Sequence, residues 1–183
     1  MMRAHPRQPD NTMRYKAFAF AAALLVPAAG AQSLLQKADK DDLVFMRDEE
    51  PAMKKAFAKA SASLNDFLAV ARAAAPTHTS FAMKVAISQG KKTEYFWVSD
   101  FAEKADGSFE GEIANEPRMV KHVKLGQRYS FPRVHIVDWT YIDTGSRAMV
   151  GNFTLCALLT KEPAAQAEAM KKRYRLDCDW LTP

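Results

Sequence analysis

Apolar residues between positions 51 and 76 recur at alternating spacings of four and three, which places them on one stripe of a helix. Acidic residues 48–50 precede Pro51, and both features favour a helix start; Pro76 ends the segment. The lysines lie off the apolar stripe, so we expect the helix to cover a sheet rather than a membrane surface or a partner. The stripe is Met53, Phe57, Ala60, Leu64, Phe67 and Ala71, and the lysines are Lys54, Lys55 and Lys59.

After Pro76 the period changes to two, which predicts strands. Phe81, Met83, Val85 and Ile87 alternate with smaller or polar residues, and Thr93 to Phe101 returns after a turn at Gly90. Asp106-Gly107 predicts a second tight turn. The remaining expected elements are strands at 108–114, 133–142 and 148–159, with bends at 115–117, 126 and 143–146 and a helix at 163–174.

These elements predict an α+β fold. The N-terminal amphipathic helix packs on a curved antiparallel meander of about five strands, and a short C-terminal helix follows. The sheet is expected either to stay open or to curl toward a barrel. Residues 48–183 are expected to form one domain, with residues 32–47 as a lead-in.

The N-terminal region has the order of an export signal. Basic residues 13–16 precede the apolar run Ala17 to Val26, and the small residues Ala29-Gly30-Ala31 suit a signal peptidase. We expect cleavage between Ala31 and Gln32, and a true start at Met13. The apolar run is too short for a stable membrane anchor. No cysteine follows it for lipid attachment, so the mature protein is expected to be periplasmic or secreted without stable membrane insertion.

The charge of the whole chain overstates how basic the folded part is. The formal net charge is +5, with 26 Lys and Arg against 21 Asp and Glu. Residues 1–31 hold four basic residues and one acidic residue, so the remainder holds 22 against 20. A nucleic-acid partner therefore loses its main support.

Two cysteines, Cys156 and Cys178, follow the export signal. Because the compartment beyond a secretion signal is oxidising, we expect them to form a disulfide. Two buried thiols or a metal pair are the alternatives, but no histidine lies at ligand spacing.

The candidate chemistry rests on two acids, Glu94 and Asp138, that lie in predicted strands near Trp97 and Trp139. Two carboxylates near apolar rings can act as a general acid and base, as in glycosidases. The alternative is structural: each carboxylate accepts hydrogen bonds from turn backbone or pairs with Lys or Arg. Strand parity places Glu94 on the face opposite Trp97.

Other residues suggest binding rather than catalysis. The candidates are the three aromatic residues and one turn, namely Trp97, Trp139, Tyr141 and Asn115-Glu116-Pro117. The histidines are dispersed, so no metal site is expected. No nucleotide-binding, zinc-protease or serine-hydrolase motif is present, and no cofactor is expected.

Several short motifs resemble, in order and spacing, the YegJ-like family of bacterial domains of unknown function, family number 2314. The resemblance spans roughly residues 48–160 and implies no established activity. It also implies that the Cys156–Cys178 bridge is an addition suited to an exported member. The motifs are Pro51 to Ala56 with Leu64 and Phe67, Phe81 to Val85, Glu94 to Val98, Phe109 to Gly111, Asn115 to Pro117, Gly126-Gln127, Ile136 to Tyr141 and Gly151 to Thr154.

The sequence therefore predicts an exported, non-catalytic domain that binds an unknown protein or envelope ligand. An envelope hydrolase using Glu94 and Asp138 is the first alternative. An immunity-like protein that binds a toxin is the second.

Overall fold

The computed structural model describes Asp48 and residues 50–181. The predicted export signal, its Ala31/Gln32 cleavage site, the start at Met13 and the lead-in at 32–47 lie outside these residues. They stay predictions.

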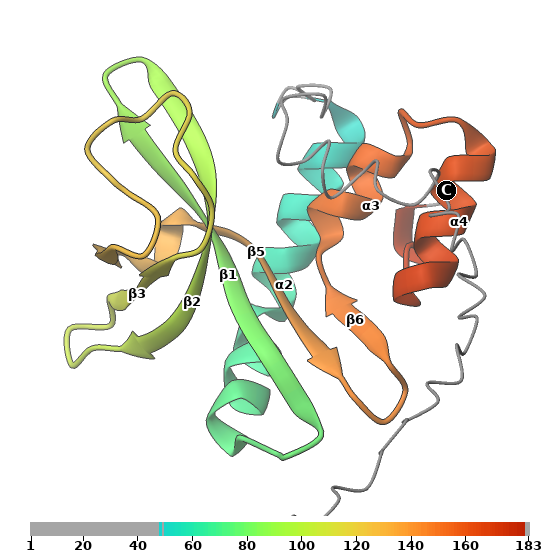
Figure 1. Cartoon of the computed structure of the whole chain (residues 1–183), viewed down its shortest axis with the longest axis horizontal. Helices are drawn as coiled ribbons and strands as arrows, with labels where there is room; N and C mark the ends of the chain where they lie inside the picture. The colour runs from blue at the N-terminus through green and yellow to red at the C-terminus, as the bar shows by residue number, and fades with distance from the viewer. Residues whose placement is uncertain (1–47, 49, 182–183) are drawn as a thin grey trace, which may run out of the picture.

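The described chain contains three α-helices and a six-stranded antiparallel sheet, so the predicted α+β class is confirmed (Figure 1). The sheet has six strands rather than about five. In chain order the elements are α2 (Pro51–Ala73), β1 (His78–Gln89), β2 (Lys92–Glu103), β3 (Phe109–Ile113), β4 (Arg128–Phe131), the 3₁₀ turn η1 (Arg133–His135), β5 (Ile136–Asp143), β6 (Ala148–Gly151), α3 (Phe153–Leu159), α4 (Ala164–Tyr174) and the 3₁₀ turn η2 (Asp179–Leu181).

The strand order is β4-β3-β2-β1-β5-β6, so the sheet is open, with β4 and β6 at its edges. β1 to β4 follow one another as a meander, and β5 then crosses back to pair with β1. The left-handed residues Ser80 and Asp100 lie at register shifts in β1 and β2. Such bulges bend a strand and increase the twist of a sheet.

Helix α2 begins at Pro51 and ends at Ala73, close to the predicted bounds. Phe67 lies at the centre of an aromatic cluster: its ring is 5.0 Å from that of Trp139 and also contacts Phe81, Phe101 and Tyr141. Lys54, Lys55 and Lys59 of α2 are exposed, as their positions off the stripe indicated. The apolar stripe therefore faces the core, as its spacing indicated.

The predicted strand at 148–159 is wrong in its second half. β6 ends at Gly151, and residues 153–159 form α3. Gly151 and Asn152 both have positive φ angles, of 79° and 54°, which turn the chain out of the strand. Residues 133–135 are likewise a 3₁₀ turn rather than strand, and β4 at 128–131 was not predicted.

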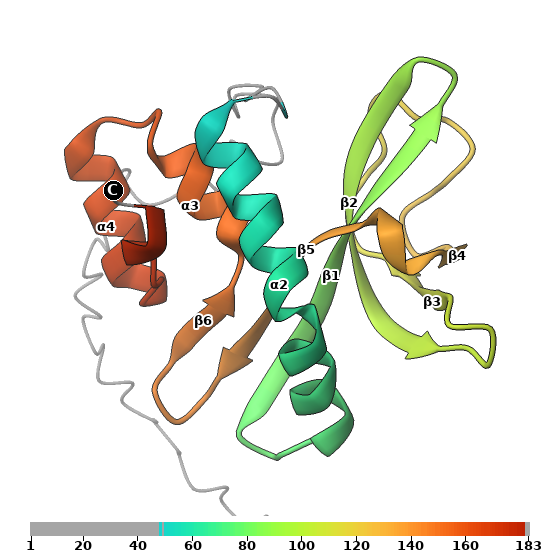
Figure 2. The same cartoon turned by 180° about the vertical axis from the view of Figure 1, so that it is seen from behind.

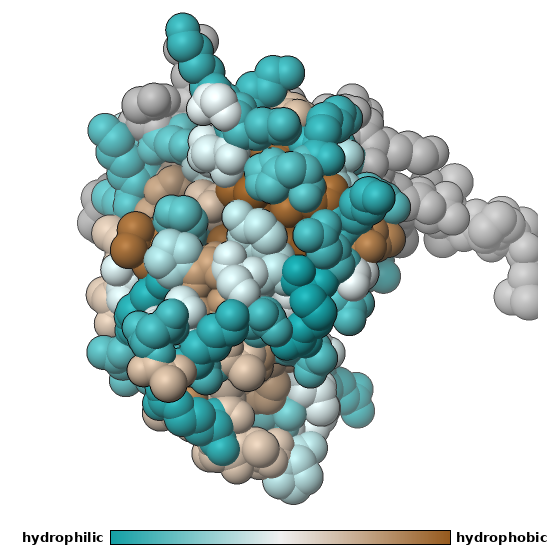
Figure 3. Space-filling view, turned by 90° about the vertical axis from the view of Figure 1, so that its left-hand side faces the viewer, coloured by the Kyte–Doolittle hydropathy of each residue, from teal (hydrophilic) through white to brown (hydrophobic). Residues whose placement is uncertain are grey.

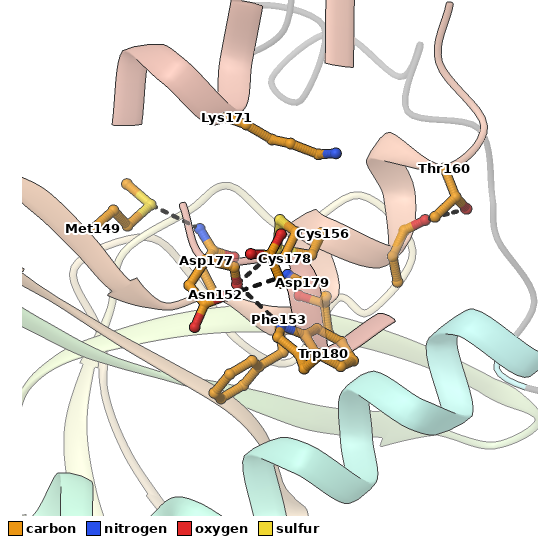
Figure 4. The surroundings of a disulfide bond; sticks show 12 residues. Met149, Asn152, Phe153, Cys156, Thr160, Lys171, Asp177, Cys178, Asp179 and Trp180 are labelled. Atoms are coloured by element: carbon orange, nitrogen blue, oxygen red, sulfur yellow. Dashed lines mark hydrogen bonds between the residues drawn. A yellow bond between two sulfur atoms is a disulfide. The ribbon is translucent and has the colours of Figure 1, made fainter. Parts of the chain in front are cut away.

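The C-terminal segment returns to α3 through a disulfide between Cys156 and Cys178, whose Cα atoms are 5.4 Å apart (Figure 4). Trp180 packs edge-on against Phe153, with the ring centres 5.4 Å apart. The predicted bridge thus joins a helix, not a strand, to the tail. The predicted helix at 163–174 is α4.

Candidate functional site

Glu94, one of the two candidate acids, lies near the start of β2 and is 8% exposed. Its carboxylate accepts hydrogen bonds from three consecutive backbone N–H groups, those of Arg118, Met119 and Val120, at 2.8, 2.9 and 2.9 Å. All three donors belong to the loop between β3 and β4. The carboxylate therefore binds this loop to the sheet.

Asp138, the other candidate, lies in β5 and is 0% exposed. Its oxygens accept hydrogen bonds from the backbone N–H groups of Trp139, Phe153 and Thr154 and from the Thr154 hydroxyl, at 2.6 to 3.2 Å. Because the N–H groups of a first helical turn lack partners within the helix, this carboxylate satisfies the start of α3.

Lys84 completes this network and was not among the sequence candidates. Its Nζ donates a hydrogen bond of 2.5 Å to the Thr154 hydroxyl and lies 4.5 Å from the centre of the Trp97 ring. Burial lowers the pKa of Lys84 and raises that of Asp138. Because side chains alternate along β1, Lys84 lies on the face opposite Met83 and Val85. No local sequence pattern pairs it with Thr154, which is 70 positions away.

This network supports structure rather than nucleophilic chemistry. The Thr154 hydroxyl donates to Asp138 and accepts from Lys84. Thr154 is buried. A nucleophile needs access to a substrate, and this hydroxyl has none through the packed side chains around it.

The structure does not bring Glu94 and Asp138 together. Glu94 pairs in register with Ile87, whereas Asp138 pairs with Lys84. Ile87 and Lys84 are three apart in β1 and lie on opposite faces, because side chains alternate along a strand. The two carboxylates also share no hydrogen-bond donor.

The candidate binding residues fall into two groups rather than one site. The Asn115 side chain accepts a 2.7 Å hydrogen bond from the Trp97 backbone N–H, so it holds the loop against β2. Glu116 is exposed and Pro117 half-buried. Trp139 is a core residue whose Nε1 donates to the Ala60 carbonyl of α2, and Tyr141 stacks on Phe81.

The described part of the chain offers neither a metal-binding cluster nor a membrane-spanning helix. Within residues 48 and 50–181, no three His, Cys, Asp or Glu side chains gather as a metal-binding group. None of the helices there is both long and apolar enough to cross a membrane.

Comparisons with known proteins agree on one family. Residues 50–177 match the bacterial family DUF2314, described as "Uncharacterized protein conserved in bacteria". The chain is also similar to "Uncharacterized protein YegJ" of Escherichia coli (strain K12): 29% of 133 aligned residues are identical, covering 73% of this chain and 84% of the relative. No solved structure matches the chain. Because the family match covers more than half of the sequence, the chain belongs to the bacterial DUF2314 family, as the resemblance indicated.

Proposed function

We propose that this protein is exported to the cell envelope and acts there as a non-catalytic binding domain. The observation that carries the proposal is that the protein's own groups donate hydrogen bonds to both candidate acids. Glu94 accepts three hydrogen bonds and Asp138 four, all from the protein itself. A general acid or base must instead keep an oxygen available for the proton of a substrate.

Export is supported by the disulfide together with the predicted signal. Disulfides such as Cys156–Cys178 persist mainly in oxidising compartments, whereas the cytosol keeps thiols reduced. The order of basic, apolar and small residues in the first 31 positions is that of a secretion signal. The two observations are independent, because the cysteines lie at the other end of the chain.

Cell fractionation with chemical cross-linking tests the proposal in a bacterium that expresses the full chain with a C-terminal tag. We expect the protein in the envelope fraction or the medium, with Gln32 as its first residue, cross-linked to a specific partner. Retention in the cytosol with Met1 or Met13 at the N-terminus would contradict export.

A hydrolase assay tests whether the protein is non-catalytic. The purified protein is incubated with envelope glycans and peptides, beside the Glu94→Gln and Asp138→Asn variants. We expect no turnover by any of the three proteins. Hydrolysis that disappears in either variant while the fold is retained would establish the hydrolase alternative.

A further inference from the structure

One end of the molecule gathers basic side chains from two segments, residues 88–93 and residues 114–127. We propose that this basic end binds an anionic membrane surface, which names the partner of the proposed envelope-binding function and rests on it. Figures 1 and 2 show that the turn between β1 and β2 projects at one end of the sheet, with the 114–127 loop beside it. No part of α3 or α4 covers this end in either view.

Hydrogen bonds and buried side chains fix the 114–127 loop against the sheet. Glu94 accepts three of its backbone N–H groups, and the Gln89 side chain accepts a fourth, that of Lys121, at 2.8 Å. The side chains of Val120 and Val123, which belong to the same loop, are buried. Because Gln89 is the last residue of β1, directly before the β1–β2 turn, its bond also fixes the two basic segments relative to each other.

The lysines on this frame are exposed and have no acidic partner among the described residues; the Lys121 ammonium donates a 2.6 Å hydrogen bond to the Arg118 carbonyl. Lys91, Lys92, Lys121 and Lys124 are exposed, and none forms an ion pair with any of the residues the structure describes. Elsewhere lysines do pair, such as Lys104 with Glu110 and Lys161 with Glu50. The two segments contain these four lysines and Arg118 against one acidic residue, Glu116.

The surroundings of the lysines favour a lipid surface over an acidic protein. Leu125, next to Lys124, is 50% exposed and is one of two large hydrophobic residues exposed in the described chain. Lysines beside an exposed apolar side chain suit a headgroup layer, where the cations meet phosphates and the apolar group enters the acyl boundary. Figure 3 views the molecule from this side and shows mainly hydrophilic residues, with hydrophobic ones among them, in its upper half.

Vesicle sedimentation tests the proposal on the protein purified from cells that express the full chain. Vesicles of phosphatidylcholine alone are compared with vesicles that also contain phosphatidylglycerol. We expect binding to the anionic vesicles only, weakening as salt is added. Replacing the four lysines with glutamine should reduce binding about six-hundredfold, since each lysine near an anionic surface contributes about fivefold. Leu125→Ser should reduce it about threefold.

A matched control removes the same charge elsewhere. Lys54, Lys55, Lys59 and Lys172 are also exposed and lie on α2 and α4. Their replacement with glutamine should leave binding within about twofold of wild type, because they lie outside the basic end. Circular dichroism of both fourfold variants checks that the fold is retained.

Three results would overturn the proposal: no preference for anionic vesicles, an equal loss in the control variant, or full binding without the four lysines. Cross-linking of the basic end to an acidic envelope protein, without vesicle binding, would also overturn it but leave the proposed binding function intact. Cytosolic retention or hydrolase activity would instead refute the proposed function, and these are read in separate assays.

Discussion

At the scale of single residues, Glu94 shows how one buried carboxylate organises a loop. Its two oxygens accept three successive backbone N–H groups that would otherwise lack partners in a partly buried segment. An unsatisfied buried donor costs more free energy than a hydrogen bond contributes. The acid is therefore needed for the position of the loop and, through it, of the basic end.

Glu94→Gln is expected to lower the free energy of unfolding by about 2 kcal/mol, because glutamine offers one acceptor oxygen and turns an NH₂ group toward backbone donors. Urea unfolding measures the loss, and hydrogen exchange should become faster at residues 118–120. Glu116→Gln, at an exposed position in the same loop, serves as the control and should leave both unchanged. Unchanged exchange in Glu94→Gln would contradict the structural role.

The buried contacts of Lys84 are also expected to stabilise the fold. Lys84→Met removes the Nζ group that donates to the buried Thr154 hydroxyl and that lies over the Trp97 ring. We expect a loss of about 2 kcal/mol in the free energy of unfolding, because a buried hydrogen bond is lost and the hydroxyl oxygen is left without its donor. Lys104→Met, which breaks an exposed ion pair with Glu110, should cost less than about 1 kcal/mol.

The same variant should change the dependence of stability on pH. Because burial lowers the pKa of Lys84, the unfolded chain binds this proton more tightly than the folded one. Stability from this group is therefore fully present above its ordinary pKa of 10.5 and is lost as pH falls through the lowered pKa. The wild type should thus gain stability as pH rises toward 10.5, relative to Lys84→Met. If the free energy of unfolding changes with pH equally in the wild type and in Lys84→Met, the lowered pKa of Lys84 is contradicted.

At the scale of elements, the junction of β6 and α3 decides where the sheet stops. Gly151 approaches the backbone and ring of Trp139 so closely that a Cβ atom there would overlap both. Asn152 then adopts the left-handed conformation, and its N–H donates 2.8 Å to the Trp139 carbonyl. The chain leaves the sheet here because two left-handed residues follow one another and Asp138 supplies acceptors for the new helix.

Gly151→Ala is expected to destabilise the fold by about 3 kcal/mol, because the added methyl group meets Trp139 and the backbone is already in a strained region. Thermal unfolding measures the effect as a lower Tm. Gly90→Ala is the control: its φ of 61° is also positive, but no atom lies within 4 Å of the added carbon. It should cost only about 1 kcal/mol. Equal losses in the two variants would show that backbone strain, not the contact with Trp139, dominates.

At the scale of the whole molecule, the Cys156–Cys178 bridge closes a loop with a sequence separation of 22 that contains α4. The tail also packs through Leu176 in an apolar cluster with Leu159 and Ala167, and Trp180 contacts Phe153. Covalent closure reduces the conformational entropy of the unfolded chain and so stabilises the folded one.

Replacing both cysteines with alanine should lower the free energy of unfolding by about 3 kcal/mol, the value for a loop of this length. Urea unfolding of the wild type, with and without reducing agent, should show the same difference. The double variant should be insensitive to the reductant. A wild type that yields two reactive thiols before reduction would contradict the bridge.

The sequence alone determined the elements whose pattern is repetitive and local. The spacing of Met53 to Ala71 places one face of α2 against the core, and the alternation around Met83 to Ile87 defines β1, because both depend only on the period of the backbone. The order of motifs was also sufficient for the family, since it needs no spatial information.

Tertiary structure alone decided the roles of the polar residues and the end of the sheet. Glu94 and Asp138 look alike in the sequence, yet one binds a loop 24 positions away and the other the start of a helix 15 positions away. Residues 153–159 are apolar enough for a strand, and become a helix because Asp138 and the left-handed pair before them lie where they do. Such outcomes depend on contacts between distant segments, which no local pattern encodes.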